Sequence, residues 1–66
     1  MKTYDVVLAT GTRKTYDTLK EAKENAVKES IKHGICGIFA HDKDGLVQLV
    51  IFYDNGKIDD VEDFNL

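Results

Sequence analysis

The chain begins with a segment in which apolar and polar side chains alternate. In TYDVVLAT (3–10), Tyr4, Val6 and Leu8 occupy every second position, so they would share one face of a strand. A turn containing glycine follows, and KTYD (14–17) predicts a short second strand. We therefore expect a hairpin at the start of the chain.

The spacing of apolar residues then changes to that of a helix. Thr18 and Glu21 match a capping box, in which each side chain accepts a backbone N–H that has no partner within the helix. Residues 19–33 are rich in good helix formers, and Gly34 suits the position after the last turn. We expect one broad apolar face, made of Leu19, Ala22, Ala26, Val27 and Ile31.

Three further strands are predicted after the helix. The segments ICGIFAH (35–41) and LVQLVIFYD (46–54) are rich in β-branched and aromatic residues, and a DKDG turn separates them. Asn55-Gly56 is a strong hairpin signal, so 57–64 should return beside the preceding strand. The order ββαβββ predicts an α+β fold, with a mostly antiparallel sheet and one helix packed on one face.

The last segment, KIDDVEDF, departs from strict alternation. Ile58, Val61 and Phe64 are three residues apart, whereas a regular strand repeats every two. The strand is therefore short or bulged, or its last turn is helical. In each case the apolar residues indicate that this segment returns into the sheet and is not a free tail.

The strand at 46–54 carries apolar side chains on both faces. Two alternating sets are predicted: Val47, Leu49, Ile51 and Tyr53 on one face, and Leu46, Gln48, Val50 and Phe52 on the other. One helix covers only one face of a sheet, so the second face would be covered by another chain or remain an apolar patch. We expect homodimerisation or partner binding through that face.

Composition limits the classes of protein to consider. The 66 residues allow one domain, residues 1–66, with a small core. The single cysteine, Cys36, cannot form an internal disulfide and is typical of a reducing compartment. The first residues lack the apolar run of a signal peptide, and no segment approaches the roughly 18 apolar residues of a membrane span. We therefore expect a cytoplasmic protein that does not bind membranes.

Charge is distributed unevenly along the chain. Residues 1–33 hold seven Lys or Arg and five Asp or Glu, whereas residues 34–66 hold two and seven. The carboxylates of the second half could steer the protein onto a basic partner, or they could solubilise it and protect an edge strand from pairing. The candidate partner-binding residues are Asp42, Asp44, Asp54, Asp59, Asp60, Glu62 and Asp63.

No motif predicts catalysis, a metal or a cofactor. His33, Cys36, His41 and Asp42 lie within ten residues, but their spacing matches no standard zinc pattern. A cysteine in an apolar strand is more often a packing residue than a nucleophile, and no third group is apparent to orient a base. The DKDG turn resembles part of a calcium loop, but Ile51 stands where that pattern requires glutamate. We predict that the protein is not an enzyme.

Basic residues in the first hairpin indicate an alternative function. Lys2, Arg13 and Lys14 cluster there with Tyr4 and Tyr16, a combination that nucleic-acid-binding proteins use. A pI of about 5.2 opposes direct nucleic-acid binding, because phosphate contacts dominate that affinity. The alternative is a small homodimeric regulatory or nucleic-acid-associated domain that uses this hairpin.

A small acidic chain of this element order without a catalytic motif resembles the small inhibitors that bacteriophages encode against host defences, anti-CRISPR proteins among them. The resemblance rests on size, charge and element order along the whole chain and on no shared motif. It implies a non-enzymatic inhibitor that occupies a basic surface of a host protein, such as a surface that binds nucleic acid. The acidic C-terminal strand and its flanking turns would be the binding elements.

Overall fold

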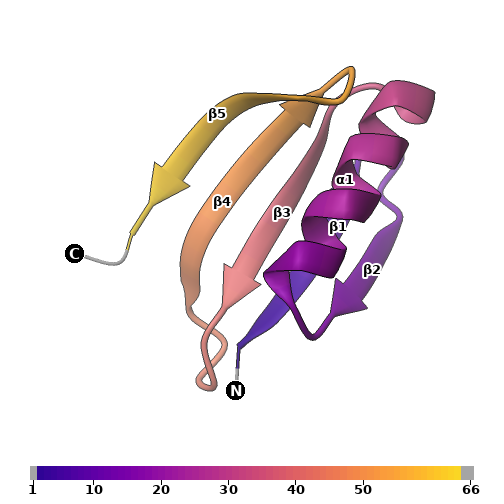
Figure 1. The fold of residues 1–66 in the computed structure, drawn as a ribbon. Coiled ribbons are helices and arrows are strands. Elements are labelled where there is room, and N and C mark those ends of the chain that lie inside the picture. Colours follow the sequence, from indigo (N-terminus) through magenta and orange to yellow (C-terminus); the bar gives the residue numbers. More distant parts are fainter. Residues whose placement is uncertain (1, 65–66) are drawn as a thin grey trace.

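The computed structural model describes residues 2–64 as one five-stranded sheet with a helix lying across it (Figure 1). Its elements are β1 (Thr3–Leu8), β2 (Arg13–Tyr16), α1 (Leu19–His33), β3 (Cys36–His41), β4 (Val47–Asp54) and β5 (Lys57–Asp63). The strand order is β2-β1-β3-β4-β5, and every neighbouring pair is antiparallel. The predicted α+β class and the order ββαβββ are confirmed.

Local signals set both ends of α1. The backbone N–H of Glu21 donates to Thr18 Oγ1 over 3.2 Å, as the capping box predicts. The Glu21 carboxylate accepts a 2.9 Å hydrogen bond from the Thr18 hydroxyl, where the motif predicts the Thr18 backbone N–H. At the other end Gly34 has a φ of 87°, and its N–H donates to the Ser30 carbonyl over 3.0 Å.

Small residues bring α1 close to the sheet. Ala22 and Ala26 are completely buried, and Ser30, four residues further on, is 1% exposed. Residues four apart lie on the same side of a helix, so these three form the line of closest contact. The prediction that Ile31 belongs to the buried face is wrong. Ile31 lies beside this line and is 61% exposed.

The core lies between α1 and the central strands. Tyr4, Val6 and Leu8 face α1 together, as their alternation predicts. The buried members of the core are Val6, Ala22, Ala26, Cys36, Ile38, Ile51 and Tyr53. Burial of this apolar surface is the main stabilising contribution in so small a domain.

An extra residue near the start of β4 interrupts the alternation. Ala40 pairs with Leu49 and His41 pairs with Val47, so Gln48 has no partner in β3. Directly paired residues share a face of the sheet, so Val47 lies with His41 and not on the α1 side with Leu49. The predicted face of Val47 is wrong because the alternation does not persist through a bulge.

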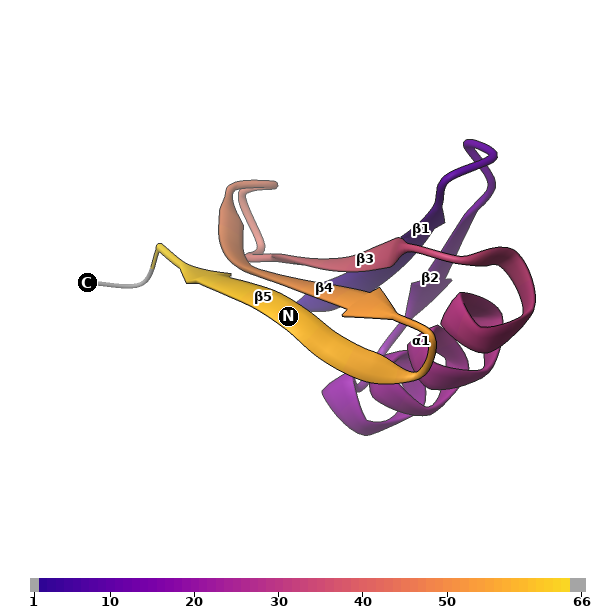
Figure 2. The same cartoon turned by 90° about the horizontal axis from the view of Figure 1, so that it is seen from above.

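The face of the sheet that points away from α1 is called the open face below. Figure 2 shows α1 on one side of the sheet and no helix of the described chain on the other. From the strand registers, the open face comprises Thr3, Asp5, Val7, Arg13, Thr15, Gly37, Phe39, His41, Val47, Val50, Phe52, Asp54, Lys57, Asp60 and Glu62. Within residues 2–64 no helix has the length and apolar character needed to cross a membrane.

Candidate interaction surface along β5

The strand β5 forms one edge of the sheet. Among residues 2–64 its only paired strand is β4, and all seven of its residues are exposed. The extensive contacts of α1 are with the other four strands, and Figures 1 and 2 show β5 on the far side of β4 from the rest of the sheet. An edge strand presents backbone N–H and C=O groups outward, so β5 is available to another chain along its length.

A bulge at Asp59 determines which way the side chains of β5 point. Tyr53 pairs with Ile58 and Phe52 pairs with Asp60, so Asp59 is an extra residue without a partner in β4. The bulge confirms one of the three conformations predicted for this segment. It also explains why Ile58 and Val61, three residues apart, both face the α1 side.

The two faces of β5 differ in chemistry. Asp60 and Glu62 lie on the open face, where they pair with Phe52 and Val50 of β4. Ile58 and Val61 lie on the α1 side, 55% and 49% exposed, beyond the cover of the helix. We define the β5 surface as Ile58, Asp60, Val61 and Glu62.

The remaining predicted carboxylates lie around this surface. Asp59 occupies the bulge, Asp54 pairs with Lys57 beside the β4–β5 turn, and Asp63 faces the α1 side. Asp42 and Asp44 come from the β3–β4 turn. After β5, the Phe64 N–H donates to the carbonyl of Gln48, near the start of β4, over 2.9 Å.

Asp42 has a structural role that separates it from the other carboxylates. Its Oδ1 accepts the backbone N–H groups of Asp44 and Leu46, both over 2.9 Å, and its Oδ2 accepts the Gln48 amide over 3.2 Å. These bonds close the turn, a role for which aspartate is favoured. Asp42 is therefore engaged within the chain, whereas the Asp44 side chain remains exposed.

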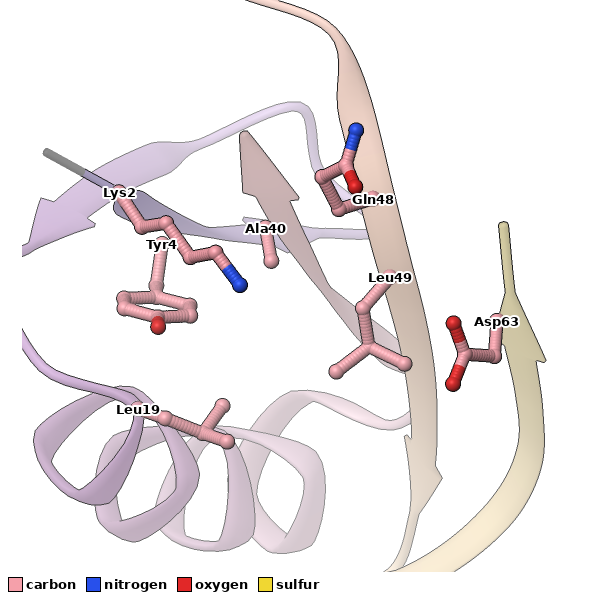
Figure 3. Close-up of a pocket in the computed structure, with 7 residues that line it drawn as sticks. All are labelled: Lys2, Tyr4, Leu19, Ala40, Gln48, Leu49 and Asp63. Atoms are coloured by element: carbon pink, nitrogen blue, oxygen red, sulfur yellow. The ribbon is translucent and has the colours of Figure 1, made fainter. Parts of the chain in front are cut away.

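A small hollow lies beside the end of β5. Figure 3 shows Lys2 extending across it from the start of the chain, with Leu19 of α1 and Leu49 of β4 among its walls. Asp63 lies on its β5 side. The volume is about 150 Å³, well below the roughly 300 Å³ at which small-molecule pockets begin. The hollow makes this end of the β5 surface uneven, but it is too small for a metabolite-sized ligand.

The open face is partly covered by its own aromatic side chains. Phe39 and Phe52 meet edge to face, with ring centroids 6.2 Å apart and planes at 87°. Both rings lie over Gly37, where an added Cβ would come within 3.2 Å of them. Val50 is only 6% exposed although no helix of the described chain covers it. The aromatic pair therefore shelters part of the apolar face that the sequence predicts.

A polar cluster on the open face was not predicted from the sequence. Asp5, only 8% exposed, accepts a 2.7 Å hydrogen bond from the Thr15 hydroxyl. Its Oδ2 also lies 3.7 Å from His41 Nδ1 and 3.8 Å from a guanidinium nitrogen of Arg13. The cluster joins β2 and β3 to β1 through side chains. Asp5 occupies a polar position in the alternation of β1, where an exposed residue is expected, so no local signal marks it as buried.

Cys36 and the nearby histidines do not converge. The Cys36 thiol faces α1 and donates to the Ala26 carbonyl over 3.3 Å, whereas His41 lies on the open face. His33 ends α1, with its Nε2 3.4 Å from a carboxylate oxygen of Glu29. Among residues 2–64, no group of three or more His, Cys, Asp or Glu is arranged to hold a metal ion.

The environment of Cys36 makes it a poor nucleophile. Burial raises the pKa of its thiol, and the nearby Glu29 carboxylate raises it further. A raised pKa lowers the fraction of thiolate, which is the reactive form. The thiol is suited to packing against α1 in the position where the sequence predicts a core cysteine.

Comparisons with known proteins supply no relative for this chain. No protein-family model matches it. A search of curated proteins found no match, and neither did a search of solved structures.

Proposed function

We propose that this protein is a non-enzymatic interaction module that binds a basic surface of another protein through its β5 surface. The observation that carries the proposal is an edge strand of seven exposed residues with Asp60 and Glu62 on one face and the aliphatic Ile58 and Val61 on the other. Protein interfaces combine apolar contacts with a polar rim, and complementary charge increases the rate and specificity of association.

Protection of the edge from aggregation explains only part of this surface. Charged residues on an edge strand discourage pairing with other chains. Ile58 and Val61 have the opposite effect, because exposed aliphatic groups on an edge favour association. A strand that carries both kinds of side chain favours a partner of complementary charge and disfavours other partners.

The proposed partner is a cytoplasmic host protein whose basic surface ordinarily binds nucleic acid. Carboxylates on a folded strand would replace phosphates in contacts with lysine and arginine. Occupation of that surface would inhibit the partner by excluding its own ligand. The resemblance to phage-encoded inhibitors of host defences, including anti-CRISPR proteins, supports this class of partner.

The basic hairpin supports the second candidate function, a small regulatory or nucleic-acid-associated domain. Arg13 and Lys14 are exposed on β2, the opposite edge of the sheet. Retention of an oligonucleotide in a gel shift at physiological salt, lost in an Arg13→Gln/Lys14→Gln variant, would favour this function over the first.

A pair of matched variants tests the first proposal. Asp60→Asn/Glu62→Gln removes two carboxylates from the β5 surface, and Asp17→Asn/Glu24→Gln removes two exposed carboxylates elsewhere. Both variants and the wild type are used to capture proteins from a lysate of the cells in which the protein is expressed. Captured proteins are purified and titrated against each chain at low and high salt.

The proposal expects at least one basic protein that binds the wild type and the control but loses affinity for the β5 variant. Added salt should weaken the wild-type complex, because ions screen exposed charges. If every captured protein binds the two variants equally well while both remain folded, the β5 surface is not the binding element.

A further inference from the structure

The two edges of the sheet carry opposite charges. The edge strand β2 has the sequence RKTY, with two cations and no carboxylate. The edge strand β5 has the sequence KIDDVED, with four carboxylates and one lysine. Each copy of the chain therefore presents a basic strand at one side and an acidic strand at the other.

The charges also match face by face. Arg13 pairs with Val7 on the open face, the face on which Asp60 and Glu62 lie. If a second copy stands beside the first with its helix on the same side, its Arg13 meets these carboxylates. Lys14 pairs with Val6 and therefore lies on the α1 side.

The α1 sides of the two edges are compatible as well. The aliphatic stem of Lys14 can lie along the exposed Ile58 and Val61 of the neighbouring β5, with its ammonium group in water. Charge on the open face and apolar contact on the α1 side would therefore act together at one junction.

Both strands are accessible to a second copy. Three of the four residues of β2 are exposed, as are all seven of β5. The Arg13 side chain is 64% exposed, and its 3.8 Å distance from Asp5 is longer than a hydrogen bond. Arg13 can therefore approach a carboxylate of another copy without dismantling the cluster around Asp5.

Strand direction defines how the copies would be related. Every neighbouring pair in the order β2-β1-β3-β4-β5 is antiparallel, so β2 and β5, four positions apart, run in the same direction. Lateral translation of one copy places its β2 parallel to the β5 of the other. Parallel strands form evenly spaced hydrogen bonds between their backbone groups.

We propose that copies of this protein associate edge to edge, with β5 of one copy paired to β2 of the next. The alternatives β5–β5 and β2–β2 would place like charges opposite each other, which is destabilising. The β5–β2 contact is heterologous and leaves one edge free at each end, so association continues beyond a dimer unless the series closes into a ring. The inference is independent of the proposed foreign partner, because it concerns the purified chain alone.

Two complementary charge variants test this pairing. Arg13→Glu/Lys14→Glu makes both edges acidic, and Asp60→Lys/Glu62→Lys makes both edges basic. The average mass of each purified chain is measured by sedimentation velocity at low ionic strength, where surface charges are least screened. Circular dichroism and thermal melting establish that each variant is folded.

The wild type should grow in mass with concentration beyond the dimer, and added salt should reverse the growth. Each variant alone should remain monomeric, whereas an equimolar mixture should associate, because each acidic edge then meets a basic one. A wild type that stays monomeric at low salt overturns the proposal, as does growth that stops at the dimer. A mixture of folded variants that fails to associate overturns it as well.

A milder pair covers the case in which a charge reversal prevents folding. Arg13→Gln/Lys14→Gln and Asp60→Asn/Glu62→Gln remove the charges without reversing them. Each neutral variant should associate only at a higher concentration than the wild type does. Unchanged association in both neutral variants would contradict the role of these four side chains.

Discussion

The backbone N–H of Gly56 donates to the Ser30 hydroxyl over 2.7 Å, linking the β4–β5 turn to the buried side of α1. The same hydroxyl donates to the Val27 carbonyl over 3.0 Å. Ser30, the polar residue in the line of closest contact between α1 and the sheet, therefore both accepts and donates a hydrogen bond. The link anchors the turn end of β5, while the rest of that strand depends on its pairing with β4.

Ser30→Ala should lower the free energy of unfolding by about 1 kcal/mol, the usual cost of losing a hydrogen bond of this kind. Urea denaturation measures the change, and hydrogen exchange should be faster at the Gly56 amide. Thr10→Ala is the control, because Thr10 and Thr12 share only an exposed hydroxyl contact. Equal stability of the two variants would mean that the Ser30–Gly56 bond contributes little.

Gly56→Ala should destabilise the protein more than Gly45→Ala. Both glycines have positive φ, 82° and 84°, so both substitutions strain the backbone. Only at Gly56 would the new Cβ collide with a side chain, lying 2.9 Å from Ile31 Cδ1 and Cγ1. Thermal melts of the two variants measure the difference.

Ile31→Ala in the Gly56→Ala background isolates that collision. The double variant should regain the stability that Gly56→Ala loses beyond Gly45→Ala. Its stability should then match that of Gly45→Ala, since only the backbone strain remains. If Ile31→Ala gives no recovery, the exposed Ile31 side chain moves aside freely and the collision has no energetic cost.

Asp5 and Thr15 should be energetically coupled. The Thr15 hydroxyl donates to a buried carboxylate, and hydrogen bonds to charged groups contribute about 1.5–3 kcal/mol. A double-mutant cycle of Asp5→Ala and Thr15→Ala, measured by urea denaturation, should give a coupling of about 1 kcal/mol or more. A cycle of Asp5→Ala with Thr12→Ala should give a coupling close to zero, and similar values for both cycles would contradict the assignment.

Titration of Cys36 should destabilise the protein at alkaline pH. The raised pKa of Cys36 means that the folded state retains a proton that the unfolded thiol loses at about pH 8.5. This contribution is fully present below that pH and is lost as pH rises toward the folded pKa, at no more than about 1.4 kcal/mol per pH unit.

Cys36→Ser supplies the comparison, because a serine hydroxyl does not titrate in this range. Between about pH 8.5 and about pH 10, urea denaturation should show a steeper loss of stability in the wild type than in the variant. The pKa of Tyr53 is also raised, by burial and then by Cys36, so the window ends where unfolded tyrosine begins to titrate. Parallel losses in both chains would show that Cys36 does not contribute.

The features predicted correctly are those that neighbouring residues determine. Thr18 and Gly34 set the ends of α1 through contacts within a few positions, so the predicted bounds 19–33 agree with the structure. The Asn55-Gly56 turn likewise acts locally and returns β5 beside β4. The DKDG turn is also local, because Asp42 accepts backbone N–H groups within it, a role that was not predicted for this residue.

The features that were missed depend on partners distant in sequence. Ser30 is buried because it lies in line with Ala22 and Ala26, and its hydroxyl accepts from Gly56, 26 residues away, a contact that no local pattern specifies. The bulge at Gln48 was missed, and among the three conformations predicted for 57–64 the bulge at Asp59 could be chosen only once β4 provided the opposing register. The acidic edge expected at 57–64 agrees with the structure, but the strand order that makes it an edge follows from the pairing of β1 with β3, which no local pattern specifies.

The bulge at Asp59 would allow β5 to lose one residue without a change in which side chains share a face. Asp59 has no partner in β4, so its deletion would leave Ile58 and Asp60 as consecutive members of a regular strand. Ile58 and Val61 would still point one way and Asp60 and Glu62 the other, with less local twist. Deletion of Asp60 gives the same sequence, but loss of one residue elsewhere along the strand would exchange the two faces beyond it. Related chains that are one residue shorter here would keep the same pattern of carboxylate and aliphatic groups.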